Sequence, residues 1–150
     1  MTDKPLKPGE ETTSAPLTAD ADLCFVGHVE TPWRDLADCP RQIGFDGPEC
    51  AVVLAPPWDR ALLGIERARH LDLVLWLHRA RRDLLTIHPA HADAPRGVFT
   101  FRSPVRPNPI GVSQVLLERV QGARLIVRGL EVLDGTPLID IKPGRCPHSV

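Results

Sequence analysis

Short apolar runs, separated by turns rich in proline and glycine, make up most of the chain. Residues 51–55 form an unbroken apolar run that Pro56 and Pro57 end, which is typical of a buried strand. Residues 71–78 are as apolar, and their leucine, valine and tryptophan side chains would cover every side of a helix. We therefore predict a strand there, although a continuous amphipathic helix over residues 61–82 is the competing interpretation.

The C-terminal half has apolar segments at regular intervals. Residues 111–120 and 124–133 flank Gln121-Gly122, which is the pattern of a β-hairpin. A turn over residues 134–137 follows, and a last strand over residues 138–141 ends before Pro143. The remaining predicted elements are strands over residues 23–31 and 98–101, and a short helix over residues 59–68 with Asp59 as its N-cap and Gly64 as a weak point.

This succession favours a mainly all-β fold, a small β-barrel with one or two short helices, over a Rossmann-type α/β fold. No G-x-G-x-x-G loop follows a predicted strand, and no P-loop is present. Residues 1–20 are polar and rich in proline, threonine and glutamate, so we predict a disordered tail there and one β-barrel domain over residues 21–150. Residues 79–96 contain no element that we can predict.

The formal net charge of −1 excludes a polycation that binds nucleic acid through its overall charge. The positive charge is nevertheless clustered, since residues 79–106 hold six arginines against Asp83 and Asp93. Arginine suits bidentate contacts to phosphate or carboxylate groups. No apolar run approaches the roughly 20 residues that a membrane helix needs. We expect neither a membrane span nor a secretory signal, and we predict a cytoplasmic protein.

Four cysteines, Cys24, Cys39, Cys50 and Cys146, show no C-x-x-C spacing. In a reducing compartment such residues are free thiols, some of them buried. Cys146 with His148, or His88 with His91, supplies only half of a zinc site. We therefore predict no metal.

The proline-rich loop over residues 97–111 is the stretch whose sequence is least explained by the requirements of folding. Three prolines within six residues exclude a helix or a central strand, and they stiffen the backbone. A stiff loop loses little entropy when a ligand binds, so it can hold polar groups in place. Those groups are Arg102, Ser103, Arg106 and Asn108. From these residues alone, the loop could equally be a rigid turn with solvated arginines.

Other polar clusters lie at the ends of predicted strands, where an all-β domain builds its sites. Asp140 lies inside an apolar strand, so its charge needs a partner such as Lys142 or a loop arginine. No G-x-S-x-G, H-E-x-x-H or paired-carboxylate arrangement is present. The residues thus predict a binding rim for an anionic or zwitterionic ligand. The polar clusters that we expect at this rim are Arg41-Gln42, His78-Arg79, residues 102–108, and residues 134–136 with Asp140 and Lys142.

Two strings carry a specific resemblance: R-S-P-V-R-P-N-P-I-G-V-S at residues 102–113 and G-L-E-V-L-D-G-T-P-L-I-D-I-K-P at residues 129–143. With Pro40-Arg41-Gln42 and residues 62–78, they make residues 25–143 similar to the TsaA-like β-barrel family. The best-known members of that family are TrmO-type methyltransferases, which use S-adenosylmethionine to methylate N6 of threonylcarbamoyladenosine beside the tRNA anticodon.

The resemblance implies a donor site in a cleft at a homodimer interface, with tRNA as partner through its anticodon loop. It implies a substrate-side role for Arg106 and Asn108, and we place Asp140 and Lys142 on that side too. It names no general base. The donor-site residues that it implies are Pro40, Arg41, Gln42, Leu77, His78, Arg102, Val112, Asp134, Gly135, Thr136 and Pro137.

Two segments depart from the family pattern. After D-I-K-P the chain continues with residues 144–147, G-R-C-P, in place of aromatic residues and proline, and residues 88–96 lack a proline-arginine insert. We also expect no second domain of the kind that longer members carry. The alternatives are therefore a methyltransferase of the same fold with another acceptor, or a β-barrel that binds RNA or a ligand without catalysis.

Overall fold

The computed structural model describes residues 5–15, 18–90 and 92–144, and the chain divides into two compact units. The larger unit comprises Leu23–Trp76 with Gly111–Val150, and the smaller comprises Met1–Asp22 with Leu77–Ile110. The chain passes from the larger unit into the smaller one after Trp76 and returns at Gly111.

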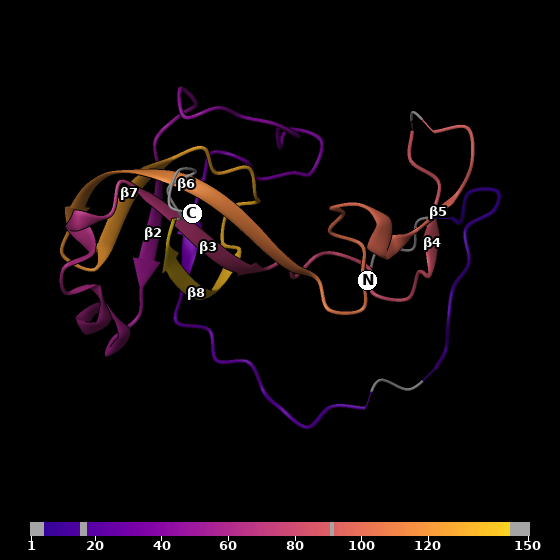
Figure 1. Cartoon of the computed structure of the whole chain (residues 1–150), viewed down its shortest axis with the longest axis horizontal. Coiled ribbons are helices and arrows are strands. Elements are labelled where there is room, and N and C mark those ends of the chain that lie inside the picture. Colours follow the sequence, from indigo (N-terminus) through magenta and orange to yellow (C-terminus); the bar gives the residue numbers. More distant parts are fainter. Residues whose placement is uncertain (1–4, 16–17, 91, 145–150) are drawn as a thin grey trace, which may run out of the picture. The chain divides into compact units, whose positions relative to one another are not determined.

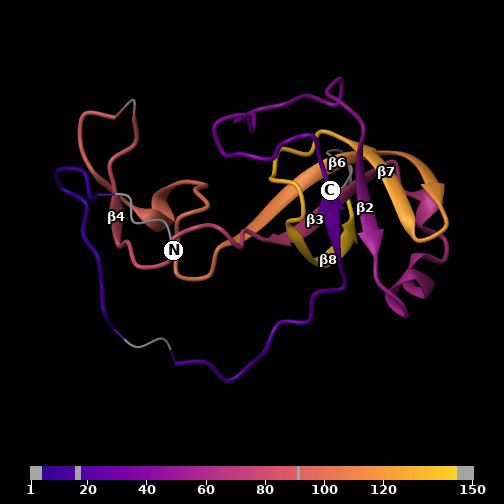
Figure 2. The same ribbon diagram turned by 180° about the vertical axis from the view of Figure 1, so that it is seen from behind.

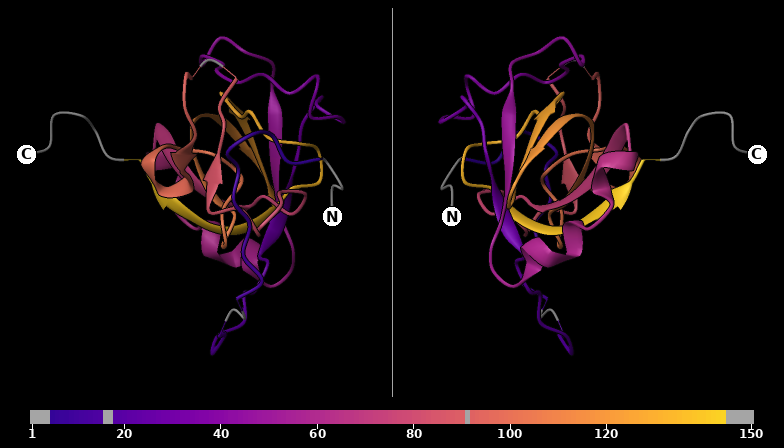
Figure 3. Two further views of the ribbon diagram at one scale, coloured as in Figure 1. Left: turned by 90° about the vertical axis from the view of Figure 1, so that its right-hand side faces the viewer. Right: turned by 90° about the vertical axis from the view of Figure 1, so that its left-hand side faces the viewer.

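The larger unit is a ring of six strands, closed as a barrel in the order β1-β2-β7-β6-β3-β8 (Figure 1). The ring can be followed from behind in Figure 2 and from two further sides in Figure 3. This arrangement confirms the predicted all-β class. The strands are β1 (Gly27–Glu30), β2 (Cys50–Leu54), β3 (His70–Trp76), β6 (Ile110–Gln121), β7 (Arg124–Arg128) and β8 (Pro137–Pro143).

Strand β3 supplies the centre of the barrel core. Leu71, Leu73 and Leu75 have no exposed surface, while the residues between them are half-buried. A period of two is the signature of a strand, because successive side chains point to opposite faces of a sheet. The predicted strand over residues 71–78 is confirmed, and the competing helix over residues 61–82 is wrong.

The predicted hairpin is also confirmed, since β6 and β7 pair in antiparallel register on either side of the turn. Strand β7 ends at Arg128, earlier than predicted, because Gly129 adopts a φ of 91°. A Cβ atom at Gly129 would also lie 2.8 Å from the Phe45 ring. Glycine is therefore the residue that lets the backbone turn here under a packed aromatic ring.

The helix predicted over residues 59–68 is wrong. Two short 3-10 helices stand there, η1 (Trp58–Leu62) and η2 (Ile65–Arg67). Gly64 separates them with a φ of 86°, a left-handed conformation that ends a helix. Asp59 is not the cap, since Pro57 occupies the N-cap position without a side-chain hydrogen bond.

The strand predicted over residues 98–101 is wrong as well. Val98–Thr100 form a 3-10 helix, η3, in which Val98 is buried while Phe99 is 80% exposed. Apolar content suggested a strand that enters the core, but only Val98 is buried. Residues 79–96, where we predicted no element, contain the short pair β4 (Thr86–Ile87) and β5 (Arg96–Gly97).

In the smaller unit, the N-terminal segment lies along β4. The Leu85 amide donates to the Glu11 carbonyl at 2.8 Å, and the Thr13 amide donates to the Asp83 carbonyl at 2.8 Å. Residues 7–13 thus have hydrogen-bond partners within the stretch predicted as a tail, and disorder of residues 1–20 in solution stays a prediction. Within the described ranges, no helix is long and apolar enough to cross a membrane.

We predict that Leu73→Ala lowers the free energy of unfolding by about 2–5 kcal/mol, because it leaves a cavity in the packed barrel core. Leu63→Ala is the matched control, since Leu63 is 97% exposed, and it should change stability by less than about 0.5 kcal/mol. Urea unfolding followed by tryptophan fluorescence measures both. Equal losses for the two variants would contradict this account of the core.

Candidate functional site

A long loop over residues 31–49 is tied to the segment that leads into β8. The Thr31 amide donates to Oδ1 of Asp134 at 3.0 Å, and the Thr31 hydroxyl donates to the Val132 carbonyl at 2.9 Å. In return, the Asp134 amide donates to the Trp33 carbonyl at 2.7 Å. These bonds fix the start of the loop against the turn that contains Asp134, and the two segments run at the same end of the barrel in Figures 1 and 2.

The turn over residues 134–137 is stabilised by hydrogen bonds of its own residues. Thr136 is 2% exposed, and its hydroxyl donates to the Leu133 carbonyl at 2.7 Å. The Gly135 amide donates to the Val29 carbonyl of β1 at 2.9 Å, while Gly135 itself is exposed. The predicted donor-site residues 134–137 thus form a rigid turn at the barrel rim.

Residues 40–42 lie on the same tied loop. Pro40 is half-buried, and the side chains of Arg41 and Gln42 are exposed. Phe45 of the same loop lies close to Gly129, where a Cβ atom would be 2.8 Å from its ring, five positions before Asp134. The structure therefore brings two of the predicted donor-site segments, residues 40–42 and residues 134–137, to one end of the larger unit.

Glu131 is a polar residue of this end that the sequence did not single out. Its Oε2 is buried, and it has no hydrogen-bond partner among the described residues. Burial raises the pKa of the Glu131 carboxyl, and the backbone N–H of Ile43 offsets part of that rise. The pKa of the Cys39 thiol is also raised, first by burial and then by the Glu131 charge. The position of an acidic residue just before the Asp134 turn was the available signal.

The other predicted donor-site residues belong to other segments of the chain. Leu77 belongs to the smaller unit, where its amide donates to the Pro109 carbonyl of the proline-rich loop at 2.8 Å. His78 and Arg102 of the same unit are exposed. Val112, near the start of β6 in the larger unit, is 53% exposed. Within the smaller unit, Leu77 therefore lies beside the proline-rich loop.

Arg106 has a structural role inside the proline-rich loop. Its Nη2 donates to the carbonyl of Val98 at 3.0 Å and to the carbonyl of Phe101 at 2.8 Å. The guanidinium thus fastens both ends of η3. Asn108 accepts a hydrogen bond from Nη2 of Arg82 at 3.4 Å. Their assignment to the substrate side stays a prediction.

Asp140 has the partner that its position in an apolar strand required. Nζ of Lys142 donates to Oδ2 of Asp140 at 2.5 Å, and the two side chains are 64% and 46% exposed respectively. An ion pair this exposed stabilises the fold by about 0–1 kcal/mol. Whether the pair contacts a substrate stays a prediction.

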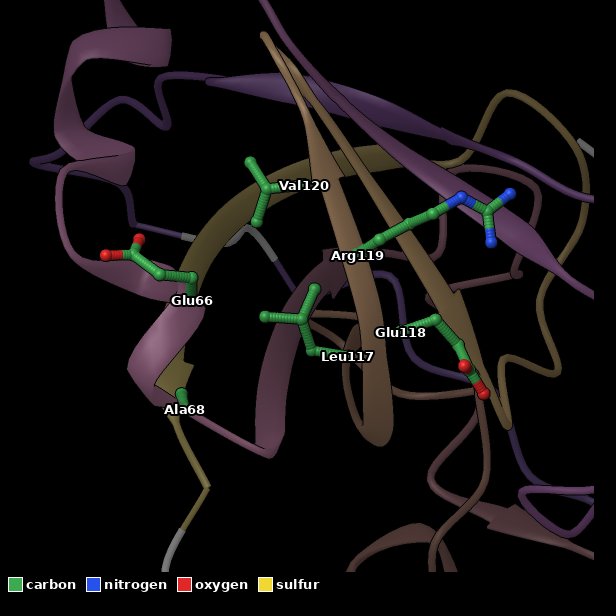
Figure 4. A pocket seen from close by; sticks show the side chains of 6 residues that line it. All are labelled: Glu66, Ala68, Leu117, Glu118, Arg119 and Val120. Atoms are coloured by element: carbon green, nitrogen blue, oxygen red, sulfur yellow. The ribbon is translucent and has the colours of Figure 1, made fainter.

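A shallow depression of about 260 Å³ lies elsewhere on the larger unit, over β6 and η2 (Figure 4). It contains none of the predicted site residues. One of its charges is already paired, because Nη1 of Arg119 lies 2.9 Å from Oε1 of Glu49. We therefore do not place the site there. Its lining residues are Glu66, Ala68, Leu117, Glu118, Arg119 and Val120.

The tied end of the barrel fits S-adenosylmethionine in its chemistry. The molecule carries a sulfonium and an ammonium group, a carboxylate, and the hydroxyl and amine groups of adenosine. Glu131 offers a carboxylate oxygen without a partner, and Arg41 offers an exposed guanidinium, which suits a carboxylate. Within the described ranges, no group of three or more His, Cys, Asp or Glu residues could hold a metal ion.

The relatives of the chain agree with this chemistry. VirR of Rhizobium radiobacter, named as a probable S-adenosyl-L-methionine-binding protein, is 46% identical over 140 residues, which are 93% of this chain and 80% of VirR. An S-adenosyl-L-methionine-binding protein of Archaeoglobus fulgidus is 41% identical over 117 residues, which are 78% of this chain and 84% of that protein. The crystal structure of TrmO from P. aeruginosa matches with a TM-score of 0.72 and 31% identity over 89% of this chain.

The fold and these relatives define the class, an S-adenosylmethionine-dependent methyltransferase fold built on a ring of strands. Residues 28–145 match the tRNA-methyltransferase O N-terminal domain, and the chain belongs to that family. This membership confirms the predicted resemblance, and with it the enzyme class and cofactor of the family. The chain spans 59% of the solved TrmO chain.

We predict that Asp134→Ala lowers the free energy of unfolding by about 1–3 kcal/mol, because the half-buried Thr31 amide loses its acceptor. Asp134→Asn is the matched control, since its side-chain oxygen can still accept that bond, and it should be nearly neutral. Thermal unfolding of the two variants measures the difference. If Asp134→Ala proves as stable as Asp134→Asn, the tie does not hold the loop.

Proposed function

We propose that the chain is an S-adenosylmethionine-dependent tRNA methyltransferase that methylates N6 of threonylcarbamoyladenosine. The observation that supports it most is the tie between the loop of residues 31–49 and the Asp134 turn. That tie presents Arg41, Gln42 and the turn from one rigid end of a barrel whose family is the tRNA-methyltransferase O N-terminal domain.

S-adenosylmethionine supplies, when bound, a methyl group on a positively charged sulfur that nitrogen nucleophiles can accept. The residues of the chain then have to hold donor and acceptor in line, because methyl transfer requires that geometry. Arg41 and Gln42 would bind polar groups of the donor with their exposed side chains. The donor-site roles of Leu77, His78, Arg102 and Val112 remain predictions.

For tRNA, we propose that exposed arginines of the smaller unit contact the phosphate backbone. Arg79 and Arg96 are exposed, whereas Arg81 forms two hydrogen bonds of 2.7 Å with the Asp83 carboxylate. Arginine forms bidentate contacts with phosphate, and such contacts make binding dependent on salt. We also propose that the protein is a homodimer and that it acts in the cytoplasm. Sedimentation of the purified chain would test the dimer.

We predict that Arg41→Ala weakens S-adenosylmethionine binding about tenfold or more, because a hydrogen bond to a charged group contributes about 1.5–3 kcal/mol. Arg34→Ala is the matched control, since Arg34 is an exposed arginine of the same loop, and it should bind like wild type. Isothermal titration measures both affinities. A wild-type chain that does not bind S-adenosylmethionine at millimolar concentration would exclude the proposed enzyme.

We predict that tRNA from a strain lacking this protein accumulates unmethylated threonylcarbamoyladenosine, and that the purified chain with S-adenosylmethionine adds one methyl group to it. Nucleoside mass spectrometry measures both changes, with S-adenosylhomocysteine in place of the donor as control. If methylated threonylcarbamoyladenosine is unchanged in the deletion strain, the enzyme has another acceptor. Binding of the donor without methylation of any RNA fraction would favour a binding module.

A further inference from the structure

The Glu131 carboxylate is an anomaly that the fold does not explain. Its Oε2 is buried, yet it has no partner among the described residues. Buried polar atoms in proteins are nearly always hydrogen-bonded, so an exception calls for a missing partner or a function. Leaving a charged group in this state destabilises the folded protein.

The surroundings of Glu131 limit what that partner can be. The loop that carries Pro40-Arg41-Gln42 lies along the residues next to Glu131, since Nε1 of Trp33 donates to the Leu130 carbonyl at 3.3 Å and a Cβ atom on Gly129 would lie 2.8 Å from the Phe45 ring. The Asp134 turn begins three residues later, and it is held against Trp33 of the same loop. A ligand that contacts residues 40–42 and the turn would therefore have Glu131 beside it.

We propose that Glu131 binds the methyl donor, with Oε2 accepting a hydrogen bond from an O–H or N–H group of S-adenosylmethionine. The inference rests on the proposed function and adds a residue to its donor site. A carboxylate oxygen can only accept hydrogen bonds, so its partner is a donating group. S-adenosylmethionine offers such groups on two separate parts of the molecule, the adenosine, with its ribose hydroxyls and adenine amino group, and the methionine, with its α-ammonium.

A purely structural role for Glu131 predicts a different response to mutation. If Glu131 served only to hold the loop in place, its loss would destabilise the fold and weaken binding in proportion. Glu131→Gln separates the two roles, because the glutamine side chain keeps the size of glutamate and one acceptor oxygen but replaces the other oxygen with an NH2 group. It also removes a buried charge that lacks a partner, so the folded state should be as stable as wild type or more stable.

The test measures binding and stability of the full chain together. We expect Glu131→Gln to bind S-adenosylmethionine about tenfold to a hundredfold more weakly by isothermal titration, with an equal or higher Tm. Glu49→Gln is the matched control, since Glu49 is an exposed glutamate paired with Arg119, and its affinity should equal that of wild type. Titration with 5′-methylthioadenosine, which keeps the adenosine but lacks the α-ammonium, then shows on which part of the donor the partner group lies.

A loss of affinity for both ligands places the partner group on the adenosine, and a loss for S-adenosylmethionine alone identifies the ammonium. If wild type binds the donor and Glu131→Gln binds it equally well, the role of Glu131 is refuted while the proposed function stands. A drop in Tm that accompanies the drop in affinity would also refute it, in favour of the structural role. If wild type binds neither ligand, both proposals fail.

Discussion

The tie between Thr31 and Asp134 is the constraint on which the rest of the candidate site depends. Residues 31–49 connect β1 to β2 without a strand of their own, so the barrel does not position them through sheet pairing. The loop is fastened instead by hydrogen bonds from Thr31 and Trp33 to residues 130–134. These bonds close the loop near its start and so restrict the positions open to its exposed residues Arg41 and Gln42.

The most unfavourable group at this end of the barrel lies within the segment that the loop is tied to. The loop runs along residues 129–134, and there Oε2 of Glu131 is buried without a hydrogen-bond partner among the described residues. A chain selected for stability alone would place an apolar residue or a paired group there. Local violations of this kind concentrate at functional sites, where the rest of the fold compensates for them.

Sequence patterns predicted the barrel well wherever burial decides conformation. The apolar run that became β3 and the hairpin of β6 and β7 needed only periodicity and a turn. Prediction failed where one backbone angle decides, as at Gly64, and where an apolar residue lies outside the core, as Phe99 does. Glu131 escaped prediction because an acidic residue beside a turn gives no sign that one of its carboxylate oxygens is buried.

The arginine-rich segment over residues 79–106 shows that composition is also a limited guide to where charge is available for binding. By composition it is a basic patch, yet Arg81 and Arg106 form hydrogen bonds within the smaller unit, to Asp83 and to the carbonyls that bound η3. A guanidinium that already donates to a carboxylate or to carbonyls has fewer N–H groups left for phosphate, and Arg81 is also neutralised by its partner. The RNA recognition that we propose for this unit would therefore depend on exposed positions such as Arg79 and Arg96 more than on its net charge.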